Sequence, residues 1–178
     1  MNMTDDLYFD TDCLSSFIWA KRLDLLEALY PGRIIIPKPV YQELTRPCVP
    51  HIKKGVQTLI SNHSAKISDL MLGSNEYELY NFLTSTKKGK QIGKGEASCI
   101  ALAKEFNGVV ASNNYRDITP YLKKYNLRNI DTGHILIDAL NQNLITEEEG
   151  NQIWKTIKSR RQWLPKNDFT EYLKSQTK

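Results

Sequence analysis

Short apolar runs alternate along the chain with longer stretches whose apolar residues recur at helical spacing. Short apolar runs bounded by polar or turn-forming residues are typical of buried β-strands, and we predict strands at 7–10, 33–37, 65–70, 108–112 and 128–131. The pattern is weakest over 65–70. The continuous apolar run at 33–37 is of the kind found in sheets that are covered on both faces.

Helices are predicted between these runs, because apolar residues recur there every three or four positions. The predicted helices are 13–29, a short segment after Pro39, 51–62, 74–83, 95–106, 118–125 and 135–140, followed by two more that begin after Thr146 and after Asp168. We expect Asp12 or Thr11 to cap the first helix, since short polar side chains accept hydrogen bonds from the free N–H groups there.

Strands that alternate with helices predict an α/β fold with three layers, in which helices cover both faces of a central parallel sheet of four to five strands. We expect a single domain, with an extended helical region at about 46–90 and C-terminal helices after about 146. The length of 178 residues suits one domain with a substantial core.

Composition indicates an ordinary globular protein, with 40% hydrophobic and 25% charged residues. No stretch approaches the roughly 18 apolar residues of a membrane span, and the N-terminus lacks the basic start and apolar core of a signal peptide. The three cysteines, Cys13, Cys48 and Cys99, are far apart and have no metal-binding spacing. We therefore expect reduced thiols in a cytoplasmic protein with no membrane partner.

The net charge of +4 is unevenly distributed. One basic run without an acid contains Lys87, Lys88, Lys90 and Lys94. A second run, 155–166, is also free of acids and is accompanied by Trp154 and Trp163. Basic runs with aromatic neighbours suit a phosphate backbone and stacked bases, although a solvated helix face over packed tryptophans produces the same pattern.

Four acidic residues occupy comparable places in this pattern: Asp10, Glu43, Glu96 and Asp117. Asp10 ends the first predicted strand, and Asp117 comes shortly after the strand at 108–112. Because parallel strands present their carboxyl ends at one edge of the sheet, all four acids can reach that edge. Carboxylates gathered without His or Cys suit a hard divalent cation such as Mg²⁺ or Mn²⁺, which would also relieve their mutual repulsion.

Four stretches resemble the motifs of PIN-domain nucleases, and in particular of VapC-type toxins. Residues 7–14 are similar to the family's apolar-Asp-Thr-Asn-x-Leu opening, and 36–44 to its Pro-x-x-Val-x-x-Glu-Leu element. Residues 93–103 resemble the Gly-Glu-Ala-x-x-Ile-Ala-Leu-Ala helix of one branch, and 109–117 the strand and turn that carry the last acid. The resemblance covers about 7–145, and the helices that follow match more loosely.

The resemblance implies metal-dependent hydrolysis of RNA phosphodiester bonds, in some relatives by a toxin that is neutralised by a small antitoxin protein; homodimers are common among such proteins. It makes Asp10, Glu43, Glu96 and Asp117 the catalytic acids, with Asp10, Glu96 and Asp117 as ligands of Mg²⁺ or Mn²⁺. Side chains expected around these ligands are Thr11, Asp12, Ser112, Asn113 and Asn114. Those expected to bind RNA are Lys87, Lys88, Lys90, Lys94 and Arg116.

Two positions depart from the family pattern. Asp12 stands where Asn is usual and adds a charge. Asn113 and Asn114 stand where many members have two Asp residues, so either Asp117 or the Asn pair occupies the last acid position. The stretch 46–90 is also longer than in compact members.

Two other functions fit parts of the same pattern. Asp10-Thr11-Asp12 resembles the nucleophile and acid of haloacid-dehalogenase-like phosphatases, but Leu14 and the Asn pair depart from that family. A PIN-like protein that binds RNA without cleaving it is the second alternative, and the Asn pair is its best support.

Overall fold

Five parallel strands form the centre of the molecule, as the computed structural model of the chain describes it for residues 5–85, 91–160 and 162–176. The strands are β1 (Leu7–Phe9), β2 (Ile34–Pro37), β3 (Ala65–Ser68), β4 (Val109–Ala111) and β5 (Arg128–Ile130). Their order across the sheet is β3-β2-β1-β4-β5. The α/β fold with a parallel sheet predicted from the sequence is thus confirmed, with five strands.

The three central strands are short because each ends where its apolar run ends. Every residue of β1, β2 and β4 is buried, as expected for strands covered on both faces. Leu7 pairs with Ile34 on one side and with Val109 on the other. The edge strand β3 is mostly exposed or partly exposed, which agrees with its weaker pattern.

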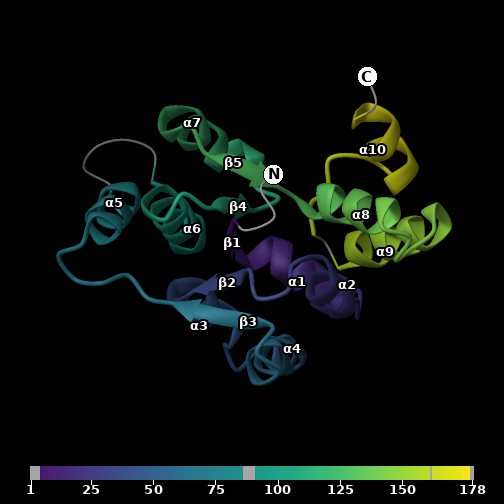
Figure 1. Cartoon of the computed structure of the whole chain (residues 1–178), viewed down its shortest axis with the longest axis horizontal. Helices are drawn as coiled ribbons and strands as arrows, with labels where there is room; N and C mark the ends of the chain where they lie inside the picture. Colours follow the sequence, from purple (N-terminus) through teal and green to yellow (C-terminus); the bar gives the residue numbers. More distant parts are fainter. Residues whose placement is uncertain (1–4, 86–90, 161, 177–178) are drawn as a thin grey trace.

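Ten helices surround the sheet in the described part of the chain. They are α1 (Thr11–Trp19), α2 (Leu23–Leu29), α3 (Lys38–Leu44), α4 (Pro50–Ser61), α5 (Asn75–Thr84), α6 (Lys94–Glu105), α7 (Tyr115–Tyr125), α8 (Thr132–Asn141), α9 (Glu147–Ser159) and α10 (Phe169–Gln176). In Figure 1, α5 and α6 lie on one side of the sheet, and α1, α2, α8 and α9 on the other. The region 46–90 contributes α4, the edge strand β3 and α5.

Four details of the expected helices were wrong. The helix α7 begins at Tyr115, three residues before the expected start at 118. The segment 13–29 is not one helix, because Lys21 adopts a left-handed backbone conformation (φ 55°) and separates α1 from α2. Asp10, rather than Asp12 or Thr11, caps α1, since the helix begins directly after the strand. The helix α8 begins at Thr132, three residues earlier than expected, because the side chain of Asp131 accepts a hydrogen bond from the N–H of His134.

The C-terminal helices are tied to the rest of the fold through buried aromatic residues. Trp154 of α9 and Phe169 of α10 are fully buried and lie with ring centroids 6.1 Å apart. Gly150 of α9 allows this contact, because a Cβ there would lie 2.4 Å from the Phe169 ring. A capping box fixes the first turn of α9: the hydroxyl of Thr146 accepts a hydrogen bond from the N–H of Glu149, and the carboxylate of Glu149 accepts one from the N–H of Thr146.

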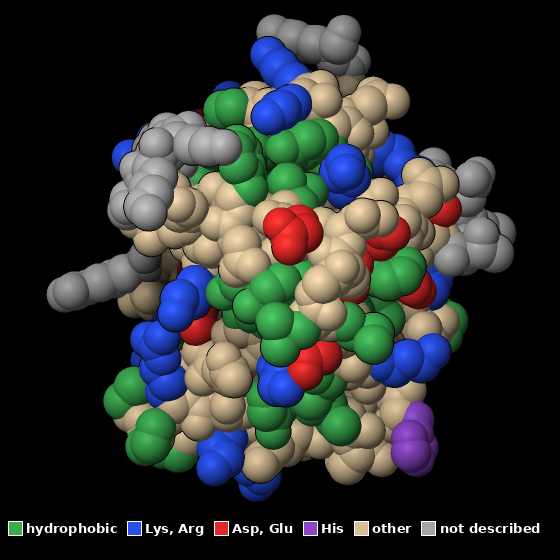
Figure 2. Space-filling model, turned by 90° about the vertical axis from the view of Figure 1, so that its left-hand side faces the viewer, with side chains coloured by type: hydrophobic (Ala, Val, Ile, Leu, Met, Phe, Trp, Pro, Cys, Tyr) green, Lys and Arg blue, Asp and Glu red, His purple; other side chains and the backbone are tan. Residues whose placement is uncertain are grey.

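The surface outside this core is mixed. Figure 2 looks onto the side that carries α5 and shows hydrophobic side chains in small groups separated by charged ones. Cys13 and Cys99 are buried and Cys48 is exposed, and all three thiols are free. In the described part of the chain, no helix combines the length and the apolar character of a membrane span.

We expect Phe169→Ala to lower the free energy of unfolding by about 3–5 kcal/mol, because it removes a fully buried ring and leaves a cavity between α9 and α10. Phe106→Ala is the matched control, since this Phe is 57% exposed, and it should change stability by less than about 0.5 kcal/mol. Urea unfolding of both variants measures the difference. Equal effects would mean that α10 is not part of the cooperative core.

Candidate functional site

The candidate site lies at the carboxyl edge of the sheet, where the chain changes direction. From β1 the chain continues outward to β2 and β3, and it later returns to place β4 on the opposite side of β1. Such a switch point leaves a crevice outside the carboxyl ends of the two central strands. Asp10 follows β1, and Ser112 follows β4, so these two residues flank the crevice.

Asp10 is almost fully buried, with 2% of its surface exposed. Its Oδ1 accepts a hydrogen bond from the N–H of Thr11 (2.7 Å), and its Oδ2 accepts one from the hydroxyl of Ser112 (3.0 Å). The backbone N–H of Asp10 also donates to the carbonyl of Ala111 (2.9 Å). The carboxylate is therefore held in one orientation by both central strands.

Glu43 reaches the same edge from α3, which follows β2. The hydroxyl of Thr11 donates to Oε2 of Glu43 over 2.7 Å, so the residue next to Asp10 holds this second acid. Glu43 is partly buried. Thr11 thus links two of the predicted acids through its backbone and its side chain.

Glu96 lies in the first turn of α6, and two glycines allow this turn to come close to the other acids. A Cβ on Gly95 would lie 2.7 Å from Oδ1 of Asp10 and 3.5 Å from Oε2 of Glu43. A Cβ on Gly93 would lie 2.1 Å from Oε2 of Glu96 itself. The Gly-Lys-Gly-Glu sequence therefore sets how closely α6 approaches Asp10 and Glu43.

Asn114 and Asp117 lie together beside Glu96. The side-chain amide of Asn114 donates to Oε1 of Glu96 (2.9 Å) and to Oδ2 of Asp117 (3.0 Å). Asp117 lies in the first turn of α7, and its Oδ1 is 3.5 Å from Nε of Arg116. Asn113 turns away from the acids, since its Oδ1 accepts a hydrogen bond from the N–H of Thr132 at the start of α8 (2.9 Å). Of the Asn pair, only Asn114 bonds to the acids.

The acids influence one another electrostatically. Burial raises the pKa of the Asp10 carboxyl well above its usual value, and repulsion from Glu96 and Asp12 adds to the rise, against the two hydrogen bonds that lower it. The pKa of Asp12 is also raised, first by loss of solvation and then by Glu96 and Glu43, although its side chain reaches solvent. The site therefore has an excess of negative charge.

No group of three or more His, Cys, Asp or Glu side chains that could hold a metal ion is found among the described residues. The carboxylates accept hydrogen bonds from neutral donors: Ser112 for Asp10, Thr11 for Glu43, and Asn114 for both Glu96 and Asp117. Asp117 is also close to the guanidinium of Arg116.

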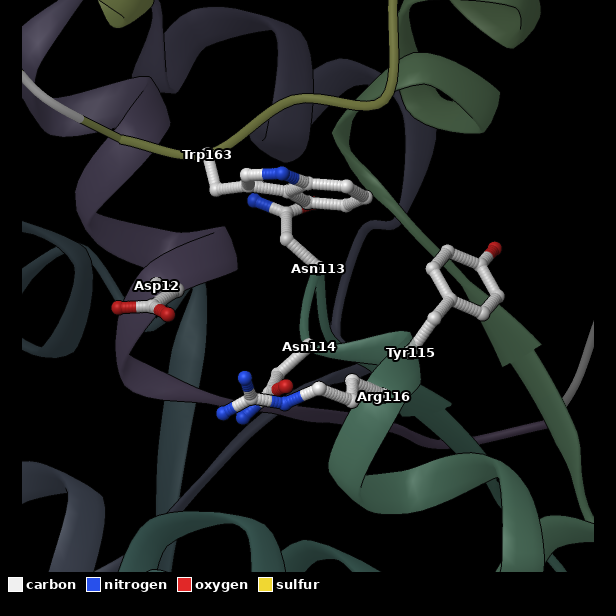
Figure 3. A pocket seen from close by; sticks show the side chains of 6 residues that line it. All are labelled: Asp12, Asn113, Asn114, Tyr115, Arg116 and Trp163. Carbon is white, nitrogen blue, oxygen red and sulfur yellow. The ribbon is translucent and has the colours of Figure 1, made fainter.

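A recess of about 400 Å³ lies beside these acids (Figure 3). It is lined by Asp12, Asn113, Asn114, Tyr115, Arg116 and Trp163. Trp163 comes from the connection between α9 and α10, far away in the sequence. The sequence drew attention to Trp163 only as a neighbour of a basic run, and its place beside the acids was not anticipated.

The residues expected to bind RNA are only partly described. Lys87, Lys88 and Lys90 lie outside the described residues. Lys94 begins α6 and is exposed next to the acids, and Arg116 is exposed at the recess.

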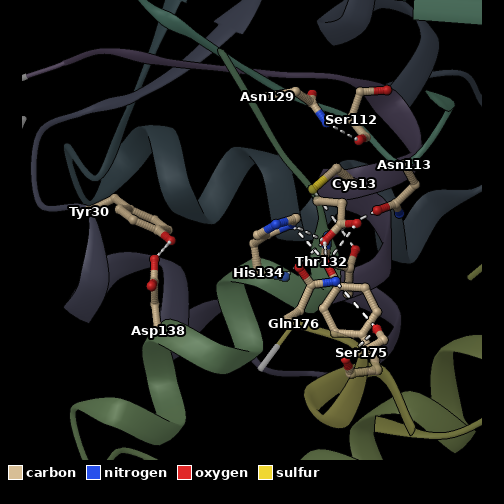
Figure 4. Close-up of polar contacts among 12 residues, drawn as sticks. Cys13, Tyr30, Ser112, Asn113, Asn129, Thr132, His134, Asp138, Ser175 and Gln176 are labelled. Atoms are coloured by element: carbon tan, nitrogen blue, oxygen red, sulfur yellow. Dashed lines mark hydrogen bonds and ion pairs between the residues drawn. The ribbon is translucent and has the colours of Figure 1, made fainter. Parts of the chain in front are cut away.

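A second polar cluster lies behind the recess and has no counterpart among the predicted site residues. The hydroxyl of Tyr172 in α10 donates to both oxygens of buried Asp131 (2.9 and 3.1 Å), and Nδ1 of His134 is 2.8 Å from Oδ1 of the same carboxylate. Burial by itself would raise the pKa of Asp131, but the interactions with His134 and Tyr172 outweigh it and lower this pKa. The hydrogen bond with Asp131 raises the pKa of His134. Figure 4 shows the surrounding contacts, among them Asn113 with Thr132. This cluster positions the C-terminal helix rather than a reacting group.

A parallel sheet with four acids at its topological switch point defines an α/β protein with an acidic site. Residues 7–178 match a family model, DUF3368, whose description is a PIN domain, and the chain therefore belongs to the PIN-domain family. PIN domains are typically nucleases and generally depend on divalent metal ions. A comparison with curated proteins gave no match.

We expect Gly95→Ala to destabilise the protein by about 1–3 kcal/mol, because its Cβ would be forced against the buried Asp10 carboxylate. The sign is informative, since Gly→Ala at an unstrained helical position normally stabilises by about 0.4–1 kcal/mol. Lys94→Ala, at the exposed neighbouring position, is the control. A stabilised Gly95→Ala variant in urea unfolding would show that α6 does not approach Asp10 so closely.

The raised pKa of Asp10 predicts a pH-dependent effect of Asp10→Asn. The unfolded carboxyl titrates near about 3.9, so the stability contributed by the protonated group is present below this pH and is lost as the pH rises through the higher folded pKa. Asn keeps the capping geometry but does not titrate. We therefore expect the stability of Asp10→Asn relative to wild type to increase from about pH 4 towards neutral pH, in urea unfolding at a series of pH values. A difference that does not change with pH would contradict the burial of a repelled carboxylate.

Proposed function

We propose that this protein is a metal-dependent endoribonuclease that hydrolyses RNA phosphodiester bonds with the help of Mg²⁺ or Mn²⁺. The observation that carries the proposal is that Glu43 is linked to Asp10 through Thr11 and Asp117 to Glu96 through Asn114, at the sheet edge where burial, and then repulsion from Glu96, raises the pKa of Asp10. Membership of the PIN-domain family supports hydrolysis of a nucleic acid.

The donor set fits a hard divalent cation, because Asp10, Glu96 and Asp117 offer only carboxylate oxygens and Glu96 repels the buried Asp10. These three residues would hold the metal, with Glu43 beside them through Thr11. A divalent cation supplies charge that makes water a better nucleophile and stabilises the negative charge that develops at phosphorus.

The other residues of the site would prepare this chemistry. Ser112 and the N–H of Thr11 fix the orientation of Asp10, and Asn114 holds Glu96 and Asp117 at one point. Lys94 is exposed beside Glu96 and suits contact with the phosphate backbone of the substrate. Positive charge next to an acidic centre would offset the repulsion between the acids and a polyanion.

A toxin function belongs to the same proposal, on the basis of the motif resemblance to VapC-type proteins. It would require a small antitoxin protein that covers the acids, and it would act on RNA in the cytoplasm, as a monomer or a homodimer. Growth arrest on expression of the wild type, but not of Asp10→Asn, would support this role.

We expect wild type to cleave RNA in the presence of Mg²⁺ or Mn²⁺, and Asp10→Asn to lose at least about 100-fold in rate, since one metal ligand and its charge are removed. Asp24→Asn is the matched control, because Asp24 is exposed and bonds only to Arg22 among the contacts described. Cleavage of a labelled oligoribonucleotide, with and without chelator, provides the measurement, and a DNA oligonucleotide of the same sequence tests the choice of RNA.

Three results would contradict the proposal. Cleavage that survives chelator, or that is equal in wild type and Asp10→Asn, would indicate a contaminating ribonuclease or another mechanism. RNA binding without cleavage, independent of metal and of Asp10, would favour a binding protein of the same fold. Turnover of a small phosphomonoester without activity on RNA would favour a phosphatase.

A further inference from the structure

Trp163 is exposed in a place where burial would be expected of a tryptophan. Its side chain is 61% exposed, whereas Trp154 is fully buried and Trp19 is partly buried beneath the guanidinium of Arg160, 4.8 Å from its ring. Figure 3 shows the Trp163 indole extending over Asn113 at one wall of the recess. An indole that packs little of its surface against the core is available to stack on a planar ligand.

Asn113 forms the part of the recess that lies below Trp163. Only 3% of its surface is exposed, and its orientation is fixed because Oδ1 accepts a hydrogen bond from the N–H of Thr132. Its Nδ2 is buried without a hydrogen-bond partner among the described residues, and in Figure 3 it lies beside the indole. A ligand in the recess therefore meets the indole rather than this amide.

The recess adjoins the proposed catalytic acids through Asn114. This residue lines the recess, and its amide bonds to Glu96 and Asp117. Arg116 lies at the rim with its guanidinium exposed. The volume of about 400 Å³ falls within the range of small-ligand sites. An exposed aromatic side chain and a cation at the rim are therefore combined within reach of the acids.

We propose, on the basis of the ribonuclease function proposed above, that this recess binds one unpaired base of the RNA next to the bond to be cleaved. The base stacks on the exposed surface of Trp163, and Arg116 contacts the adjoining phosphate. Every nucleobase has a π-face, which fits this pair of groups. A base in a duplex cannot offer its face, so the recess selects single-stranded or looped RNA.

The first test measures binding of a short single-stranded oligoribonucleotide to the Asp10→Asn protein, which prevents cleavage during the measurement. Trp163→Ala should weaken binding by roughly 5- to 100-fold, the effect expected from one lost base–aromatic stack, whereas Trp163→Phe should retain most of the affinity. Phe106→Ala is the matched control, since it also removes an exposed aromatic ring, but at the far end of α6 from Glu96. Equal affinities of all variants would overturn the recess as a base site.

The second test asks whether Trp163 contacts a particular base. A series of oligoribonucleotides, each with one abasic position, should show one position at which removal of the base weakens binding to the parent protein but not to its Trp163→Ala derivative. Loss of affinity at every position alike would mean that Trp163 acts only through the local fold and would overturn the proposal. Because these measurements need no cleavage, position-specific stacking in a protein that proves inactive would support the recess while refuting the ribonuclease. Metal-dependent cleavage without any effect of Trp163 would do the reverse, and absence of RNA binding would overturn both.

Discussion

The buried carboxylate of Asp10 is the constraint on which the geometry of the site depends. It lies at the end of β1, where the flanking strands leave little access to water. This burial disfavours the charged form and raises the pKa of the carboxyl. The N–H of Thr11 and the hydroxyl of Ser112 replace the missing water, and Gly95 lets α6 approach without a clash. The start of α1, the end of β4 and the first turn of α6 are thus arranged around the Asp10 carboxylate, whose burial would be unfavourable without these contacts.

The same requirement explains the amide at position 114. Glu96 and Asp117 both accept hydrogen bonds from the side chain of Asn114, which holds the two carboxylates near each other. A carboxylate at that position would repel both neighbours. Asn114 is therefore a neutral link between Glu96 and Asp117.

The C-terminal helices complete the recess, although they are far from the acids in the sequence. Trp154, Phe169 and Tyr172 attach α9 and α10 to the fold, and Tyr172 does so through Asp131, the cap of α8. The connection between α9 and α10 then carries Trp163 to the recess beside the acids. Burial of these aromatic residues is thus linked to the shape of the crevice in which substrate would lie.

The sequence by itself determined the parallel sheet, the approximate position of most helices, and the four acids, because strand ends and helix starts follow from local apolar patterns and turn residues. It did not determine that Lys21 interrupts the first helix or that Asp10 is its cap, since both depend on backbone geometry at single residues. Only the tertiary structure decided that Asn114 joins Glu96 to Asp117, that Asn113 turns towards α8, and that Trp163 lines a recess with Asn114. These contacts connect segments with no shared periodicity, and they form because the parallel pairing of β1 with β4 brings otherwise distant polar groups to one edge of the sheet.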